Sequence, residues 1–282
     1  MSPTAGPALT PAQIAAVSAT SDETILALLE RAGRSSRAVP LDKRFLQQGT
    51  GPIRTPGPLA EIVRRHAERD LDLLLLGHAV ASAAPYDITE AADVWARTVD
   101  LGRSDSSRTT VSKAFSRLDK VHHLVARNRD GRLLRVSLLA ADGSGAPYEH
   151  PGDEPDGRYL RLPFSYWEQG WHRKLNLAGK AFLLISLSLA DGFNLPAEKG
   201  PDWYGLSPDT IEAGVAKLAE HKLVSVARVP KKAPLAPEGY TIENRYTLHA
   251  PFGPRGVLAK GAPRPAKKTA RARLAGTRKA TT

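Results

Sequence analysis

Seven polar side chains between Ser107 and Arg117 have the types and spacing to donate hydrogen bonds from one face of a helix. They are Ser107, Arg108, Thr109, Ser112, Lys113, Ser116 and Arg117, and none of them is acidic. Val111, Phe115 and Leu118 recur at helical spacing, so a helix here buries one apolar stripe and exposes this polar face. Guanidinium and ammonium groups bind phosphates and guanine edges, and hydroxyls donate to either. The spacing therefore predicts a helix face that contacts double-stranded DNA.

A basic hairpin is predicted directly after this helix, completing a stretch from Ser106 to Val136. Strands are expected over 123–127 and 133–139, and Asp130-Gly131 between them supplies the positive-φ backbone that a tight turn requires. The hairpin tip carries Asn128, Arg129 and Arg132. With the helix in the major groove, we expect this tip to lie on phosphates or in the minor groove.

The segments before the helix complete a predicted domain over residues 59–141. Residues 59–66 and 71–83 have helical apolar spacing, and a further helix is expected over 89–101 with Thr89 as its cap. Helix, helix, turn, helix and hairpin, in this order, resembles the winged helix-turn-helix superfamily of DNA-binding domains. The resemblance rests on residues 95–139, and it implies that the helix beginning near Ser107 enters the major groove.

The same pattern recurs one hundred residues further along the chain, within residues 158–250. Thr110, Val111, Phe115 and Leu118 match Thr210, Ile211, Val215 and Leu218. The turn at 205–210, Gly-Leu-Ser-Pro-Asp-Thr, resembles the helix-turn-helix of many bacterial regulators. We therefore expect tandem winged helix-turn-helix domains in a mainly α protein with small β-hairpin wings, of the α+β class. Chance overlap of two amphipathic helices is the alternative interpretation.

The two predicted domains differ in the charge of their equivalent helices. The exposed face of the second helix carries Asp209, Glu212 and Glu220, and carboxylates are repelled by phosphates. The first domain is therefore expected to bind DNA, and the second to form a homodimer, bind a protein partner or touch DNA only through its hairpin. That hairpin contains Lys231 and Lys232 as further candidates for DNA contact, with a basic solvated loop as the alternative.

The net charge of +11 is concentrated near the C-terminal end. Residues 255–282 hold nine of the 40 Lys and Arg residues and no acid, which leaves 31 basic against 29 acidic residues elsewhere. The Ala-Pro-Lys-Arg composition of 251–282 predicts a disordered tail that resembles those of linker histones and bacterial nucleoid-associated proteins. Its Lys267, Lys268, Arg271 and Arg273 are expected to bind DNA by counterion release, without reading sequence. A tail that only aids solubility is the alternative.

Two further segments are predicted to precede or connect these domains. Residues 1–58 are expected to form a partly disordered N-terminal arm with one short helix, capped at Ser21, while glycines and prolines keep 34–58 extended. Residues 142–157 are dense in Gly, Pro and acid, which is typical of a linker between domains. We expect the carboxylates of this linker to be solvated rather than to bind a metal.

Motifs for catalysis and for membrane insertion are missing from the sequence. The eight histidines include no pair at zinc-binding spacing, and Gly49 to Pro52 lacks the Gly-Lys-Ser/Thr ending of a phosphate-binding loop. Without cysteine the chain forms neither disulfides nor thiolate zinc sites, and its apolar runs are shorter than the roughly 20 residues that span a bilayer. We expect a cytoplasmic, nucleoid-associated protein that is not an enzyme and needs no cofactor, metal or membrane.

Three roles remain compatible with such a DNA-binding chain. A bacterial transcription regulator is the first, because this is the largest class with winged helices. A replication initiator of a plasmid or mobile element is the second, since initiators resemble paired winged helices of similar length. The third is an architectural or segregation adaptor, in which the acidic helix of the second domain binds a protein and the tail binds DNA.

Overall fold

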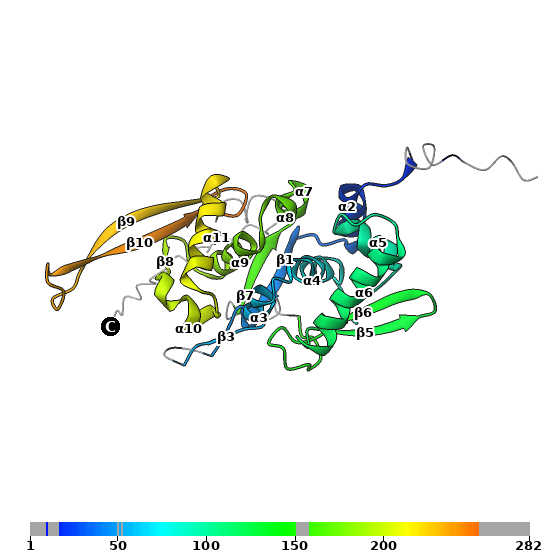
Figure 1. Ribbon diagram of the computed structural model, residues 1–282, viewed down its shortest axis with the longest axis horizontal. Coiled ribbons are helices and arrows are strands. Elements are labelled where there is room, and N and C mark those ends of the chain that lie inside the picture. The colour runs from blue at the N-terminus through cyan, green and yellow to red at the C-terminus, as the bar shows by residue number, and fades with distance from the viewer. Residues whose placement is uncertain (1–9, 11–16, 50, 52, 151–157, 254–282) are drawn as a thin grey trace, which may run out of the picture.

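The computed structural model describes residues 10, 17–49, 51, 53–150 and 158–253. It is a mixed α/β structure, 43% helix and 23% strand, whose strands form four small antiparallel sheets. Within these ranges, no helix has the length and apolar character needed to cross a membrane. Two units with the same order of elements lie on either side of a central strand pair (Figure 1).

The first unit consists of three helices and a three-stranded sheet. Its elements are α4 (Glu68–Val80), β4 (Asp87–Glu90), α5 (Ala92–Thr98), α6 (Asp105–Lys120), β5 (Val125–Asp130) and β6 (Leu133–Leu138). Strand β6 lies between β4 and β5 and is antiparallel to both. The predicted stripe of Val111, Phe115 and Leu118 is buried, and the Phe115 ring lies edge to face with Trp95 at 5.1 Å. This stripe fixes α6 against α5 and leaves the polar face outside.

Three local details of the first unit differ from the prediction. Thr89 lies in β4 rather than capping a helix, because β4 pairs with β6 at Thr89 and Arg135, a long-range contact that local spacing does not encode. Helix α6 begins at Asp105 with Ser104 as its N-cap. The hairpin turn is formed by Gly131 and the residue after it, since Asp130 still pairs with Leu133, and Gly131 has φ 58°.

The second unit repeats this order of elements. It consists of α9 (Leu177–Ser188), β8 (Phe193–Asn194), the 3-10 turn η3 (Ala197–Lys199), α10 (Gly200–Tyr204), α11 (Pro208–Glu220), β9 (Val224–Lys232) and β10 (Tyr240–Leu248). Its sheet has the order β8-β10-β9, so the last strand is again in the middle. Ile211 and Leu218 are buried like their counterparts Val111 and Leu118, at no more than 1% exposure. The two units thus share the strand order and two of the three matched apolar positions, whereas Val215, the counterpart of the buried Phe115, is only half-buried.

The segment before the first unit, over its described residues between 20 and 64, packs into the body, although residues 34–58 were predicted to form only an extended arm. It contains α2 (Ser21–Ala32), β1 (Ala38–Asp42), η1 (Lys43–Phe45), β2 (Gln47–Gln48), β3 (Thr55–Pro56) and α3 (Leu59–Arg64). Strand β1 pairs along its whole length with β7 (Tyr159–Pro163), which is followed by the short helices α7 (Ser165–Glu168) and α8 (Trp171–Lys174). Val39 and Leu41 are buried between the units because β7 and the helices cover them.

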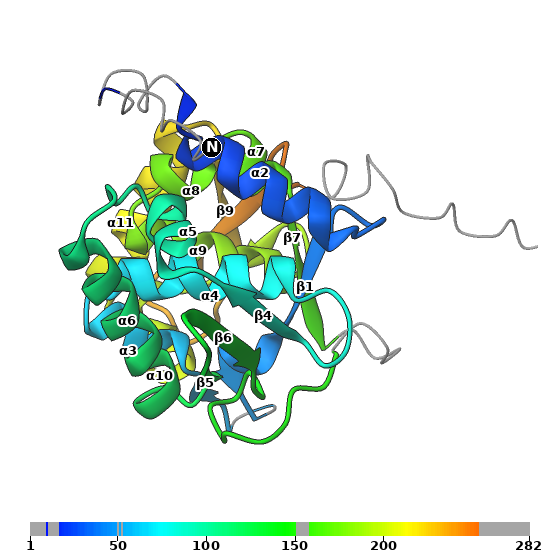
Figure 2. The same cartoon turned by 90° about the vertical axis from the view of Figure 1, so that its right-hand side faces the viewer.

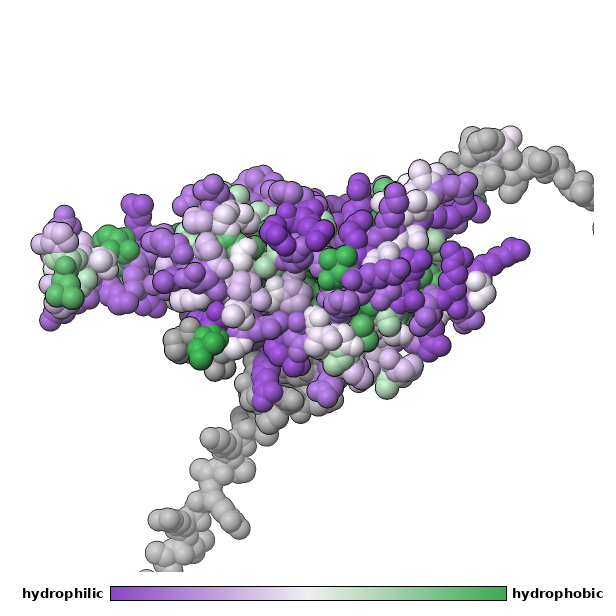
Figure 3. All heavy atoms as spheres, turned by 60° about the horizontal axis from the view of Figure 1, so that its bottom comes forward, coloured by the Kyte–Doolittle hydropathy of each residue, from purple (hydrophilic) through white to green (hydrophobic). Residues whose placement is uncertain are grey.

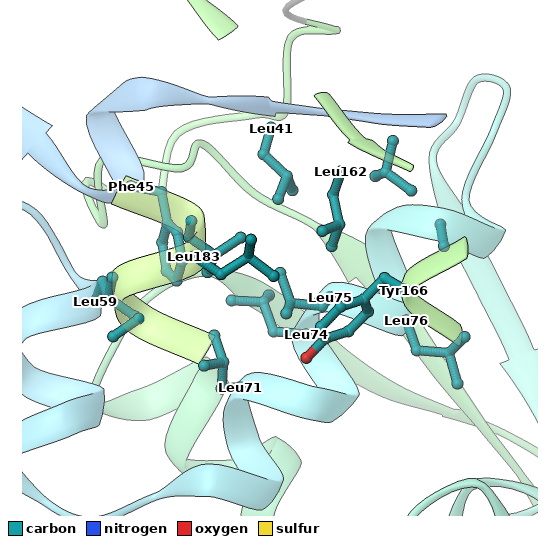
Figure 4. Packing of buried hydrophobic residues seen from close by; sticks show 14 of the residues in the cluster. Leu41, Phe45, Leu59, Leu71, Leu74, Leu75, Leu76, Leu162, Tyr166 and Leu183 are labelled. Atoms are coloured by element: carbon teal, nitrogen blue, oxygen red, sulfur yellow. The ribbon is translucent and has the colours of Figure 1, made fainter. Parts of the chain in front are cut away.

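One hydrophobic cluster joins both units (Figure 4). Leucines of α4 and β1 meet Leu162 of β7, Leu183 of α9 and Tyr166 of α7 in its centre. An ion-pair cluster adds to this junction: Lys180, only 2% exposed, donates to both carboxylate oxygens of Asp72 at 2.7 and 2.8 Å. Since Asp72 lies on α4 and Lys180 on α9, the two units form one body.

The predicted linker, residues 142–157, is described over 142–150, and that part packs on η1 and on the first unit. Arg44 donates to the Asp142 carboxylate at 3.3 Å, and the Tyr148 ring lies 4.9 Å from the ring of Tyr86. Residues 151–157 lie outside the described residues.

The two hairpins project from opposite ends of the body (Figure 1). The β5–β6 hairpin lies beside α6 at one end, and Figure 2 looks toward its tip. The β9–β10 hairpin extends well beyond the opposite end and has nine residues in each strand, against six in each strand of the first. The surfaces beside the two hairpins therefore face different directions.

Candidate nucleic-acid interface

The exposed face of α6 and the inner face of the β5–β6 hairpin enclose an open groove of about 330 Å³. It is lined by Ala92, Arg108, Thr109, Ser112, Lys113, Arg127, Arg129, Arg132, Leu133 and Leu134. Five of these side chains are cationic and none is acidic. The structure thus brings together helix residues and hairpin residues that the sequence assigned separately to DNA contact.

Three cations of the groove are available for a ligand. Lys113, Arg129 and Arg132 are exposed and form no ion pair with any residue that the structure describes. Thr109 is exposed beside them, and Ser112 is half-buried. A cation that is not paired with a carboxylate of the same chain attracts an approaching anion more strongly, because no nearby negative charge offsets its field.

Arg108 is held at the rim of the groove by two acids. Its Nε donates to Asp93 at 2.8 Å and its Nη1 to Asp105 at 2.6 Å. The hydrogen bond to Asp93 is the main cause of the raised pKa of Arg108. The prediction that this helix face carries no acid was wrong at its first turn, because α6 starts two residues earlier than Ser107 and includes Asp105.

Arg117 is directed away from the groove. Its Nε and Nη2 donate to the two carboxylate oxygens of Asp70 at 2.7 and 2.5 Å, and the Asp70 side chain is completely buried. This two-point bond is the main cause of the raised pKa of Arg117. Arg117 therefore makes a structural contact between α6 and α4 and does not line the groove.

Ser107 and Ser116 also lie outside the groove lining. Ser107 is 7% exposed, and its backbone N–H donates to the Ser104 hydroxyl at 3.1 Å, which caps the helix. Ser116 is half-buried one turn beyond Ser112. Asn128 is exposed on the hairpin, but it is not among the lining residues of the groove.

Arg127 is a groove residue that the sequence interpretation did not select. Its Nη1 donates to the backbone carbonyl of Ser112 at 2.8 Å, which ties the hairpin to the middle of α6. The sequence could have indicated Arg127, because it is two residues from Arg129 and the two side chains therefore share one face of a strand. That face is the one turned toward the helix.

The remaining predicted contacts lie elsewhere. Lys231 forms an ion pair with Glu243 across the second hairpin, and Lys232 is exposed near its tip, at the end of the body opposite to the groove. Lys267, Lys268, Arg271 and Arg273 lie outside the described residues. Figure 3 shows apolar side chains on the β9–β10 hairpin, whereas the surface at the opposite end is mostly hydrophilic.

Among the residues in the described ranges, no three His, Asp or Glu side chains are grouped so as to hold a metal ion. The chain matches no family model, no curated protein and no solved structure. Its functional assignment therefore depends on the geometry and charge of the groove.

Proposed function

We propose that the chain binds double-stranded DNA through the groove of the first unit, with α6 in the major groove and the β5–β6 hairpin on the adjacent backbone. The observation that carries this proposal is the lining of the groove, with five cations, two hydroxyls and no carboxylate. A backbone of phosphates is attracted to such a surface, and arginine and lysine distinguish guanine by its major-groove edge.

The order of elements in each unit fits a winged helix, and we extend that interpretation to both units. Helix, strand, helix, helix and hairpin, with the last strand in the middle of the sheet, supports it. The basic tail then adds contacts to phosphates that do not depend on sequence.

Transcription regulation in a bacterial cell is the role we propose for this binding. Replication initiation is the second candidate, and the shared core favours it, because a tandem pair fixed in one body can occupy DNA as a monomer. A regulator is expected to bind an inverted repeat as a dimer, whereas an initiator is expected to bind direct repeats as a monomer.

A selection of binding sites from random duplex oligonucleotides, followed by sizing of the complexes, tests the proposal. The expected result is an enriched motif for which Lys113→Ala lowers affinity by about 1 to 3 kcal/mol, with a much smaller loss on random DNA. The symmetry of the motif and the stoichiometry then distinguish regulator from initiator. Failure to enrich any motif, or equal losses on both DNAs, would contradict sequence-specific binding.

A further inference from the structure

The second unit has a larger groove at the position equivalent to the first, about 810 Å³ in volume, between α11 and the β9–β10 hairpin. Apolar side chains form its floor: Ile211 is 1% exposed and Tyr246 5% exposed. Val226 and Ile242 line its outer part and remain 43% and 54% exposed. Large aliphatic side chains this exposed in a concave surface indicate a site for another chain segment.

The charges of this groove are all negative. Glu198, Glu212 and Glu243 line it, and no Lys or Arg does. Glu243 is paired with Lys231 and Arg245, whereas Glu198 and Glu212 are exposed and form no ion pair with a described residue. Burial raises the pKa of Tyr246 on the groove floor, and the field of these two carboxylates raises it further. An occupant must therefore carry positive charge and some apolar groups.

The chain itself contains such a segment. Residues 264–279 hold seven of the nine tail cations, no acid, and Leu274 among the arginines. The tail begins at a fixed point of the same unit, since Phe252 is 1% exposed and Gly253 N–H donates to the His249 carbonyl at 2.8 Å.

Distance allows the tail to reach the groove. Gly253 is seven residues from Tyr246, so the two are separated by no more than about 25 Å. Residue 264 lies eleven residues beyond Gly253 and can extend to about 35 Å from it. Because the tether keeps the segment at an effective concentration on the order of millimolar, even a weak contact is populated.

We propose that the groove of the second unit binds residues 264–279 of the same chain and withholds the tail from DNA. Two exposed carboxylates attract the cations of the segment, and the apolar floor receives its leucine and the aliphatic parts of its lysines and arginines. DNA and the groove compete for the same cations, so the tail is released when DNA offers a denser array of anions. The regulatory part of this inference rests on the proposed DNA binding, whereas the docking does not.

Cross-linking in the full chain tests the docking without DNA. The sequence has no cysteine, so Ala216→Cys in the groove together with Ala270→Cys in the tail gives a single possible disulfide within one chain. In oxidised glutathione at low salt we expect this disulfide to form within the monomer about tenfold faster than in a control that pairs Ala270→Cys with Ala219→Cys. Ala219 lies on α11 outside the groove lining. About 1 M salt should remove this difference in rate, because the Debye length falls to about 3 Å. Equal closure rates at low salt, or cross-linked dimers in place of closed monomers, overturn the proposal.

Affinity for random duplex DNA tests the regulatory part. Glu198→Gln with Glu212→Gln in the full chain should raise this affinity about threefold to tenfold more than the control pair Glu30→Gln with Glu149→Gln, which changes net charge equally at exposed positions outside the groove. The advantage should disappear when Lys267, Lys268, Arg271 and Arg273 are all changed to Gln. If both double variants raise the affinity for DNA equally, the proposal that the groove withholds the tail is overturned. The same holds if the groove variant still binds DNA more tightly than its control after the four tail cations have been changed. Absence of DNA binding by every variant contradicts the proposed function and leaves the cross-linking result to decide the docking.

Discussion

The grooves of the two units lie at the same place in the same order of elements, between the third helix and the hairpin, and carry opposite charge. The first is lined by five cations and no acid, and the second by three carboxylates and no cation. Their helices nevertheless bury matching residues, Val111 with Ile211 and Leu118 with Leu218. The buried stripe thus determines how the third helix packs in each unit, whereas the side chains on its other face determine the charge of the groove and hence the kind of ligand that it attracts.

This difference limits what the order of elements says about function. A helix followed by a hairpin forms a groove in both units, but only the first groove attracts phosphates. The hairpins also extend in opposite directions (Figure 1), so the two grooves do not face one continuous surface. We therefore propose DNA as the ligand of the first unit and a basic segment of the chain itself as the ligand of the second.

The largest expected effect follows from removing the free cations of the first groove. Changing Lys113, Arg129 and Arg132 together to Gln should lower affinity for the selected DNA site by about 1000-fold, since each contact with phosphate or base contributes about 1 to 2 kcal/mol. The slope of log affinity against log salt should also fall by about 3, because about 0.9 is lost for each phosphate contact. Fluorescence anisotropy across a salt series measures both quantities.

A charge-matched variant on the other hairpin is the control for this comparison. Lys222, Arg228 and Lys232, all changed to Gln, reduce the net charge equally but lie on or directly before the β9–β10 hairpin, at the opposite end of the body. We expect a loss of less than about threefold, from weakened long-range attraction alone. Equal losses in the two triple variants would remove the distinction between the units.

The second prediction concerns Arg117, which shares α6 with Lys113 but has a structural partner. Arg117→Met leaves the buried Asp70 without its two-point bond and should lower the free energy of unfolding by about 3 kcal/mol. Lys113→Met, on the exposed face of the same helix, should change it by less than about 0.5 kcal/mol. Urea unfolding measures both variants.

Adding Asp70→Asn to Arg117→Met should restore part of that stability, because the unpaired charge is removed. If the double variant is no more stable than Arg117→Met alone, the buried carboxylate is not the cause of the loss.

Sequence patterns predicted the parts of the fold that depend on nearby residues. The stripe at Val111, Phe115 and Leu118 was visible because helical spacing is local, and so was the repeat of this stripe one hundred residues later. The pairing of β1 with β7 was not predicted, because Val39 and its partner Leu162 are far apart in sequence and a five-residue strand carries little information about its partner.

The candidate groove was predicted only in part for the same reason. Arg108 and Arg117 have the same side chain and lie on the same helix, so spacing alone could not separate them. Arg108 has a local partner in Asp105, but the other partners, Asp93 of Arg108 and Asp70 of Arg117, lie 15 and 47 residues away, and only the fold brings them to the helix. The cations that remain free are those with no acid on a neighbouring element.

The smallest of the three effects tests the junction that holds the two grooves apart. His172 of α8 is 6% exposed and lines a cavity of about 550 Å³ together with Asp70 and Arg117 of the first unit and Lys180 of the second. Burial, with a smaller contribution from Arg173, lowers the pKa of His172 from 6.5 to about 4.

In the unfolded chain this imidazole takes up a proton as the pH falls below about 6.5, while in the folded chain it stays neutral until about pH 4. Its contribution to stability is therefore full above pH 6.5 and is lost on acidification, by about 2 kcal/mol between pH 7 and pH 5. His172→Gln cannot take up this proton, so its stability should fall by about 2 kcal/mol less than that of the natural chain over the same interval, whatever the substitution costs at pH 7. The exposed His249→Gln is the control and should keep the natural pH dependence. Parallel pH profiles for the natural chain and His172→Gln would mean that His172 is solvated, and that the junction between the acidic and basic grooves is more open than its buried contacts indicate.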